Sequence, residues 1–233
     1  MFHLGAQCTP PKVSIVPYIP MLKENNIGKG FFEPHEHTAI RGALPSYLRP
    51  VVTLAYHSGW RKEEILSRTV DKVNMHEGTI RLDAGETKNE EGRTYYVNDD
   101  VREAITEALA NRNPACPYLF QRDREQIKDF RRAWETACIE AGFHEVVTDE
   151  EGNQTKVPTK LFHDYRRTAV RDMVRSGIPE RVAMKISGHK TRSVFDRYNI
   201  VSDRDLREAA MKKQVYHEKQ TNAVVPFKRA QND

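Results

Sequence analysis

Four residues between positions 161 and 201 carry side chains suited to chemistry at a phosphate: His163, Arg166, His189 and Tyr198. An arginine guanidinium binds two phosphate oxygens in a planar fork, and an imidazole donates a hydrogen bond or moves a proton near neutral pH. A tyrosine oxygen is a nucleophile that can form a covalent intermediate. Taken singly, each residue is more often a paired or exposed polar group than a functional one. The interpretation therefore rests on their order and spacing.

The first two of these residues are expected on one helix. Apolar residues recur at roughly helical spacing from Phe162 to Val174, with charged residues at the other positions. This pattern predicts an amphipathic helix over residues 163–175. His163 and Arg166 are three positions apart, so they should share a face of that helix.

The other two residues are expected at and after a turn. A glycine and a proline follow the first helix, which predicts its end and the start of a short second helix that runs to Ile186. The Ser-Gly pair after it predicts a turn that presents His189 at a helix end. The next helix is then expected to carry Tyr198.

Composition sets the broad class of the protein. The chain has 233 residues, 38% of them hydrophobic, which is enough for one large or two small domains with a folded core. The mean hydropathy is −0.72. The N-terminal residues lack the basic and apolar regions of a signal peptide, and no apolar run approaches ~20 residues. We therefore expect a cytoplasmic protein with no membrane partner.

Positive charge is concentrated around the four residues. The formal net charge is only +4, but residues 160–216 contain 14 Lys or Arg against 7 Asp or Glu, a net of +7, and the remainder carries −3. A surface that binds a polyanion requires such a concentration. Solvated charged helices would give the same count, so charge alone does not decide the function.

No pattern predicts a metal or a disulfide framework. The three cysteines, Cys8, Cys116 and Cys138, contain no Cys-x-x-Cys pair and cannot all pair within the chain, which favours a reducing compartment. His35 and His37 flank a glutamate near the start of a helix expected over residues 34–43, but no third ligand lies nearby. We interpret the two histidines as surface residues at the start of that helix.

A second arginine opens a helix further along the chain. Residues 45–58 predict a buried helix that Gly59 ends, and Arg61 follows in the sequence GWRKEEIL. Glu64 lies three positions further on, where it could orient Arg61. A plain ion pair on the helix surface is an equally good interpretation.

Strands are expected between residues 70 and 97, where short β-branched and aromatic runs flank the acidic loop GETKNEEG. That loop contains Lys88, which on sequence alone is an ordinary loop lysine. Helices are expected over residues 99–111, 125–141 and 203–215, with a polar hairpin or loop over residues 146–156. The chain is thus predicted to be an α+β protein, mainly α-helical, with a small antiparallel β-sheet near the N-terminal part.

The order His-x-x-Arg, then Ser-Gly-His, then a tyrosine nine positions later closely resembles the C-terminal motif of the tyrosine recombinases, the phage integrase family. The resemblance covers about residues 31–211 and implies the tyrosine recombinase catalytic domain fold. Within it, Arg61 matches the catalytic arginine that follows a glycine turn, and Lys88 matches a catalytic lysine on a β-hairpin. The implied catalytic residues are Arg61, Lys88, His163, Arg166, His189 and the nucleophile Tyr198, with Glu64 supporting Arg61.

The resemblance also implies a mechanism. Tyr198 would attack a DNA phosphodiester, form a 3′-phosphotyrosine and release a 5′ hydroxyl that later attacks back. The two arginines would hold the non-bridging oxygens, His163 would accept the tyrosine proton or bond to the phosphate, His189 would donate to a non-bridging oxygen, and Lys88 would protonate the leaving oxygen. No cofactor and no metal are implied. The expected partner is double-stranded DNA, bound as a homotetramer on two duplexes.

The division of the chain follows from the same resemblance. Residues 1–30 are rich in proline and glycine and are expected to be a linker or the remnant of a missing N-terminal DNA-binding domain. Residues 31–216 would form the catalytic domain and residues 217–233 a C-terminal tail.

Two other functions remain open beside a site-specific recombinase or integrase. A type IB topoisomerase would share the tyrosine and the basic residues, but it would relax DNA without a defined site or a partner duplex. A non-catalytic or truncated DNA-binding module would occupy a site without cutting it. Such a module has no need of the tyrosine or of a lysine at a hairpin tip.

Overall fold

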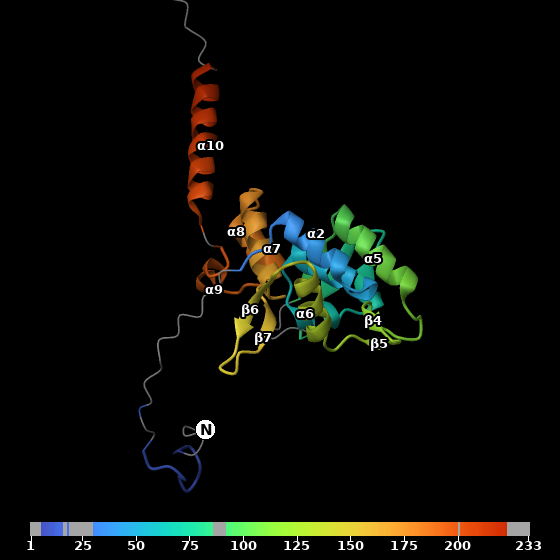
Figure 1. Ribbon diagram of the computed structural model, residues 1–233. Coiled ribbons are helices and arrows are strands. Elements are labelled where there is room, and N and C mark those ends of the chain that lie inside the picture. Colours follow the sequence, from blue (N-terminus) through green and yellow to red (C-terminus); the bar gives the residue numbers. More distant parts are fainter. Residues whose placement is uncertain (1–5, 16–17, 19–29, 86–91, 200, 223–233) are drawn as a thin grey trace, which may run out of the picture.

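The computed structural model describes residues 6–15, 18, 30–85, 92–199 and 201–222, and these are mainly helical with three small antiparallel sheets (Figure 1). The helices are α2 (Pro34–Ala43), α3 (Arg49–Ser58), α4 (Lys62–Leu66), α5 (Asp99–Asn111), α6 (Arg131–Glu140), α7 (Asp164–Arg175), α8 (Glu180–Ser187), α9 (Arg192–Asp196) and α10 (Asp203–Asn222). The strands are β1 (Val73–Asn74), β2 (Thr79–Leu82), β3 (Arg93–Tyr96), β4 (Gln121–Arg122), β5 (Glu125–Gln126), β6 (His144–Thr148) and β7 (Gln154–Pro158), with short 3₁₀ turns at Ser46–Leu48 and Val70–Lys72. The predicted fold class is confirmed.

The second predicted helix begins later than expected. Residues 46–48 form a 3₁₀ turn, and α3 starts only at Arg49 with Pro50 in its first turn. Proline has no N–H to donate to the carbonyl four residues earlier, so it suits a first turn and not a helix interior. Gly59 ends α3 in the left-handed region, with φ +65°, as the sequence predicts.

An apolar core holds helix α7 against the N-terminal helices. Helix α3 is buried along most of its length and packs against both α5 and α7. Phe32 stacks on Tyr165 of α7 with ring centroids 4.1 Å apart, and Trp134 of α6 meets Tyr165 edge-on at 5.7 Å. Aromatic pairs in these geometries contribute about 0.5–1.5 kcal/mol each beyond their burial. They fix the position of α7, which carries Arg166.

The three-stranded sheet has the order β1-β2-β3, with all neighbours antiparallel and Ile80 opposite Tyr95. Side chains alternate along β3, so that Arg93 and Tyr95 are buried while Thr94 and Tyr96 are exposed. β3 packs against α8, which brings the sheet to the Ser-Gly-His turn. The predicted strands are confirmed, whereas the expected hairpin lysine, Lys88, lies outside the described residues.

The helix predicted over residues 125–141 is too long. Residues 125 and 126 pair with β4 in a short hairpin, and α6 begins only at Arg131. The turn of this hairpin places Asp123 and Arg124 at φ 55° and 68°, a conformation that interrupts helical periodicity. Helix α5 starts as predicted, and it is capped by Asn98, whose side chain accepts a hydrogen bond from the Val101 N–H.

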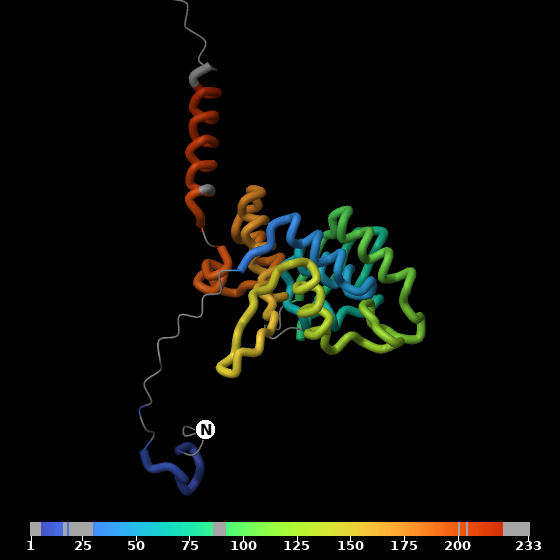
Figure 2. The backbone as a smooth tube through the Cα atoms, viewed as in Figure 1, coloured from blue at the N-terminus to red at the C-terminus, as the bar shows by residue number. Residues whose placement is uncertain are grey.

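The C-terminal segment differs from its prediction in two ways. Tyr198 lies beyond the last residue of α9 and is therefore not on a helix. Helix α10 continues past the expected end near Val215 to Asn222, so the expected tail from residue 217 begins inside it. An ion pair between Arg175 and Asp205 anchors its first turn, with N and O 2.6 Å apart. Beyond that turn the helix leads away from the body of the protein (Figures 1 and 2).

Candidate active site

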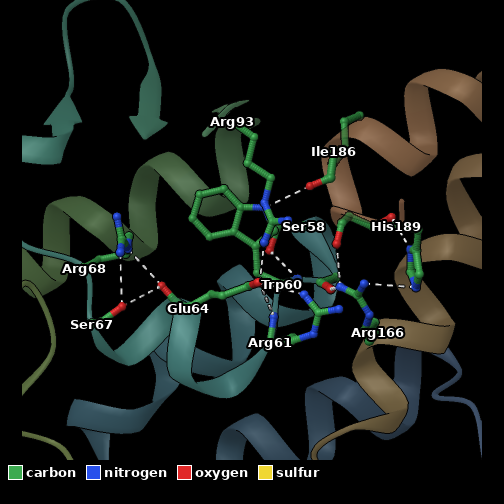
Figure 3. A network of polar contacts seen from close by, with 12 residues as sticks. Ser58, Trp60, Arg61, Glu64, Ser67, Arg68, Arg93, Arg166, Ile186 and His189 are labelled. Atoms are coloured by element: carbon green, nitrogen blue, oxygen red, sulfur yellow. Dashed lines mark hydrogen bonds and ion pairs between the residues drawn. The ribbon is translucent and has the colours of Figure 1, made fainter. Parts of the chain in front are cut away.

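Arg166 is the centre of a buried polar network that joins three segments (Figure 3). Its side chain is only 2% exposed. Nη1 donates to the carbonyl oxygens of Gly59 and Ser187, at 2.6 and 2.5 Å, and Nη2 lies 2.9 Å from Nε2 of His189. Burial lowers the pKa of Arg166, and the nearby Arg61 lowers it further. The guanidinium is thus held by main-chain dipoles, and no carboxylate among the described residues forms an ion pair with it.

The protonation state of His189 follows from its partners. Arg166 can only donate, so Nε2 of His189 accepts and the ring proton sits on Nδ1. Nδ1 lies 2.7 Å from the Ser187 hydroxyl, which itself donates to the carbonyl of Ala183 at 2.7 Å. Burial, followed by the charges of Arg166 and Arg61, lowers the pKa of His189 to about 3. His189 is therefore neutral at pH 7.

Tyr198 is placed next to both histidines by a turn of the chain. Its N–H donates to the carbonyl of the fully buried Phe195 at 2.8 Å. The hydroxyl lies 3.1 Å from Nε2 of His163, and the ring centroid lies 4.8 Å from that of His189. The guanidinium carbon of Arg166 lies 5.5 Å from the same ring. The phenol oxygen thus faces a basic nitrogen inside a cationic environment.

His163 is the residue that precedes the first turn of α7. The residue keeps contact with solvent, but partial burial, followed by the charges of Arg166 and Arg167, lowers the pKa of His163. A lowered pKa leaves the imidazole neutral at pH 7, with a lone pair to accept a proton. The 3.1 Å contact is within the reach of a general base.

Arg61 and Glu64 form a second anchored pair. Arg61 is the N-cap residue of α4, and the Glu64 carboxylate accepts hydrogen bonds from both its backbone N–H and its Nη1, each at 2.9 Å. Glu64 is only 4% exposed, so the interpretation as a helix-surface ion pair is wrong. The helix start is further fixed by Trp60, whose indole N–H donates to the Ile186 carbonyl of α8 at 2.9 Å. This places Arg61 on the same side as the Ser-Gly-His turn.

Arg93 links the Arg61–Glu64 pair to the Ser-Gly-His turn. The sequence analysis did not identify it as a site residue. Its guanidinium donates to the Glu64 carboxylate in a short, buried ion pair, and it lies 5.3 Å from the ring of Trp60. Its other side lies directly against Gly188, where a Cβ would overlap the guanidinium. The signal that could have revealed it is the alternation of β3, which puts an arginine on the buried face beside Tyr95.

The structure brings five of the six predicted catalytic residues together. Arg61, His163, Arg166, His189 and Tyr198 converge from α4, α7, the turn after α8 and the segment after α9 (Figure 3 shows three of them). Lys88 lies outside the described residues, in the loop between β2 and β3. The arrangement can hold an anionic oxygen near Arg61 and Arg166 while it deprotonates the tyrosine.

His37 is not the surface residue that the sequence suggested. It is 8% exposed, stacks on Tyr56 with centroids 4.2 Å apart, and its Nδ1 lies 3.1 Å from the Tyr165 hydroxyl. Among the described residues, no group of three or more His, Cys, Asp or Glu side chains is arranged to hold a metal ion. No described helix is long and apolar enough to cross a membrane.

Comparisons with known proteins identify similar chains. The model of the phage integrase family matches residues 32–204. The chain is 24% identical to tyrosine recombinase XerA of Pyrococcus furiosus over 164 residues, covering 69% of this chain and 52% of that protein. It is 20% identical to the integrase of Salmonella phage P22 over 206 residues, covering 83% of this chain and 49% of that protein. The chain thus spans about half the length of the curated relatives it matches.

Solved structures are similar in fold. A crystal structure of XerA recombinase superposes with a TM-score of 0.62 at 20% identity, covering 78% of this chain and 65% of that one. The Tn1549 transposon integrase, solved in complex with a circular intermediate DNA, gives a TM-score of 0.64 at 15% identity, covering 82% of this chain and 68% of that one. At these identities the likeness shows a shared fold.

Proposed function

The chain belongs to the phage integrase family, and from that premise we propose that it is a site-specific DNA recombinase or integrase that cleaves and rejoins strands through a 3′-phosphotyrosine. The observation that carries the proposal is the 3.1 Å contact between the Tyr198 hydroxyl and Nε2 of His163, beside the buried guanidinium of Arg166. A surface that only binds DNA would not need a nucleophilic hydroxyl in contact with a general base such as His163.

The first step is attack by the tyrosine oxygen. His163, neutral at pH 7 because its pKa is lowered, takes the proton from the Tyr198 hydroxyl as the oxygen bonds to phosphorus. The bond from phosphorus to the 5′ oxygen breaks, and that oxygen leaves as a hydroxyl. The phosphodiester energy is retained in the tyrosyl ester, so the reverse attack by a 5′ hydroxyl rejoins the strand without ATP.

Charge on the phosphorus oxygens is stabilised by the two arginines. Arg166 keeps a fixed orientation because two carbonyl oxygens accept from its Nη1, which leaves Nη2 on the side of His189 and Tyr198. Arg61 is oriented by its hydrogen bond to the Glu64 carboxylate. Such preorganised donors lower the barrier by about 2.7–4 kcal/mol each. This is the positioning and electrostatic logic of phosphoryl transfer.

His189 has two states in this scheme. Without DNA its Nε2 accepts from Arg166. A phosphate oxygen that takes over the Arg166 hydrogen bond leaves Nε2 free to carry a proton and donate to a non-bridging oxygen. Ser187 allows this change because its hydroxyl can either accept from or donate to Nδ1. Lys88, on the loop between β2 and β3, is proposed to protonate the leaving oxygen on the basis of its position in the sequence.

The proposed partner is double-stranded DNA. Among the similar solved structures, a lambda integrase is a dimer bound to a COC′ core site, with a TM-score of 0.57 and 73% of this chain covered. We propose that the present chain acts as a homotetramer on two duplexes. Residues 31–216 would form its catalytic domain, residues 1–30 a linker and residues 217–233 a tail.

The proposal can be tested by trapping the covalent intermediate. The chain is incubated, in EDTA and without ATP, with nicked suicide duplexes whose sequence is randomised around the nick, and adducts are resolved on a denaturing gel. Tyr198→Phe is the matched control, since it removes only the hydroxyl. We expect an adduct with the native chain and none with the variant.

The sequences recovered from the adducts separate the remaining functions. Enrichment of one defined sequence supports a site-specific recombinase. Adducts spread over all sequences, together with relaxation of supercoiled DNA, would instead indicate a topoisomerase. A band shift with no adduct would refute strand cleavage and leave a DNA-binding module.

A further inference from the structure

An open pocket of about 480 Å³ lies beside the proposed active site, between β3 and α8. Among the described residues that line it, four are cationic and none is a carboxylate, the cations being Arg93, Arg181, Lys185 and Lys190. His189 also lines it, so the pocket shares a wall with the proposed catalytic centre. A cavity with this lining is suited to an anion.

Two of the cations come from one face of α8. Arg181 and Lys185 are four residues apart, the spacing that places side chains above each other on a helix. Both are exposed, and neither forms an ion pair with any carboxylate in the described part of the chain. Like charges at this spacing repel each other and destabilise a helix. An anion bound between them would offset that repulsion.

Other arginines near α8 are paired. Arg175 binds Asp205, and Arg192 binds both Glu180 and Asp196. Glu180 is the immediate neighbour of Arg181 in the first turn of the helix, yet its carboxylate contacts Arg192 and not the pocket. The charges of Arg181 and Lys185 are therefore not balanced by a carboxylate in the described part of the chain.

The floor of the pocket allows a close approach of a backbone phosphate. Gly92 and Gly188 contribute no side chains there. Arg93 lies against Gly188 with its charge balanced by Glu64, which fixes its position. His189 contacts Arg166 and also lines the pocket, so a DNA strand that presents one phosphate to Arg166 carries further phosphates close to the pocket, because DNA has a charge every ~3.4 Å of rise on each strand.

We propose that this pocket binds a second backbone phosphate of the same DNA duplex, close to the phosphate that Tyr198 attacks, through Arg181 and Lys185. This inference rests on the proposed function. The contact fixes the register of the strand in the active site and carries no base information, as phosphate contacts do elsewhere.

The first test measures how salt affects binding to a short random-sequence duplex. Arg181→Gln/Lys185→Gln is compared with the native chain and with Arg122→Gln/Arg124→Gln, which removes the same charge from the β4–β5 hairpin, well separated from α8 in Figure 1. The logarithm of the association constant falls linearly with the logarithm of the salt concentration, and loss of one phosphate contact makes this slope less steep by about 0.9. We expect this change in the pocket variant alone, with thermal unfolding unchanged in both. Equal slopes in all three proteins overturn the proposal.

The second test locates the phosphate. On a duplex recovered by adduct trapping, single methylphosphonates replace each phosphate near the cleavage point in turn. At one position, neutralisation should weaken binding of the native chain by roughly 10- to 100-fold, the range for a charged hydrogen bond, and should have no further effect on Arg181→Gln/Lys185→Gln. If every position weakens both proteins equally, the pocket does not bind a phosphate.

The two proposals fail in different ways. If the native chain forms adducts, but no methylphosphonate weakens its binding more than that of the pocket variant, phosphate binding by the pocket is refuted and strand cleavage is not. A lowered salt slope in the pocket variant without adducts from the native chain supports the pocket and refutes cleavage. The absence of any DNA binding by the native chain would refute both.

Discussion

Replacement of Glu64 by Gln should destabilise the protein, because this one carboxylate balances two arginines. It accepts from the backbone N–H and Nη1 of Arg61 and from Arg93, and it is 4% exposed. The amide keeps the shape and one acceptor oxygen, but its NH₂ group would face a guanidinium that can only donate. Arg93, itself 8% exposed, would be left as a buried charge without a counter-charge.

The magnitude follows from the burial of the pair. Removal of one partner of a buried ion pair costs about 3–5 kcal/mol. The Arg61 side chain is 37% exposed and keeps part of its hydration, so we expect the lower end, about 3 kcal/mol. Cleavage should also slow as Arg61 loses its orientation, by less than the roughly 10²–10³-fold expected for loss of a stabilising donor.

A double-mutant cycle tests this reasoning. The free energy of unfolding is measured in urea at pH 7 for the native chain, Glu64→Gln, Arg93→Met and the double variant. Because the double variant leaves no unbalanced buried charge, its loss should be smaller than the sum of the single losses by about 1–3 kcal/mol. Additivity within about 0.5 kcal/mol would refute the claim that Glu64 and Arg93 balance each other.

Three further predictions concern the histidines and the turn. His163→Gln should slow single-turnover cleavage by roughly 10²–10⁴-fold, because it removes the general base. We also expect the cleavage rate of the native chain to rise with pH below about 6.5, where His163 with its lowered pKa loses its proton, and this rise should be absent in the variant. His189 has a pKa of about 3 in the folded protein, below its unfolded value, so the unfolded chain binds more protons between about pH 3 and 6.5. The free energy of unfolding should therefore fall as the pH falls across that window. His189→Asn should reduce the slope of this free energy against pH by about 1.4 kcal/mol per pH unit, which urea unfolding at several pH values would measure. Gly142→Ala, at φ +86° with open space around it, should cost about 1–2 kcal/mol, whereas Gly188→Ala, at φ +72°, should cost more because its Cβ would also overlap the Arg93 guanidinium. Only Gly188→Ala should impair adduct formation, because its Cβ would displace Arg93; equal impairment would contradict this role.

Local patterns in the sequence were sufficient for much of the fold. The amphipathic pattern after His163, the start of α2 at residue 34 and the two hairpins all match the structure, because periodicity and turn residues act over a few positions. The start of α6 was misplaced because residues 125–126 pair with a neighbouring strand, and pairing is not visible in helical spacing.

The site could be predicted only in part. The resemblance supplied Arg61, Arg166 and the nucleophile, but burial depends on contacts between distant segments. Glu64 fits a surface helix by spacing, but it is buried in an ion pair with Arg93 of β3, which is distant in the sequence. Arg93 was missed for the same reason, since its partners Glu64 and Gly188 lie 29 and 95 positions away in the chain.

The most direct test of the central claim is to identify the linkage in the covalent adduct. The adduct is digested with protease and nuclease, and the nucleotide-bearing peptide is sequenced by mass spectrometry. We expect a nucleotide joined through its 3′ phosphate to Tyr198, with a free 5′ hydroxyl on the released strand. A phosphate on any other residue, or a linkage through the 5′ phosphate, would contradict the mechanism.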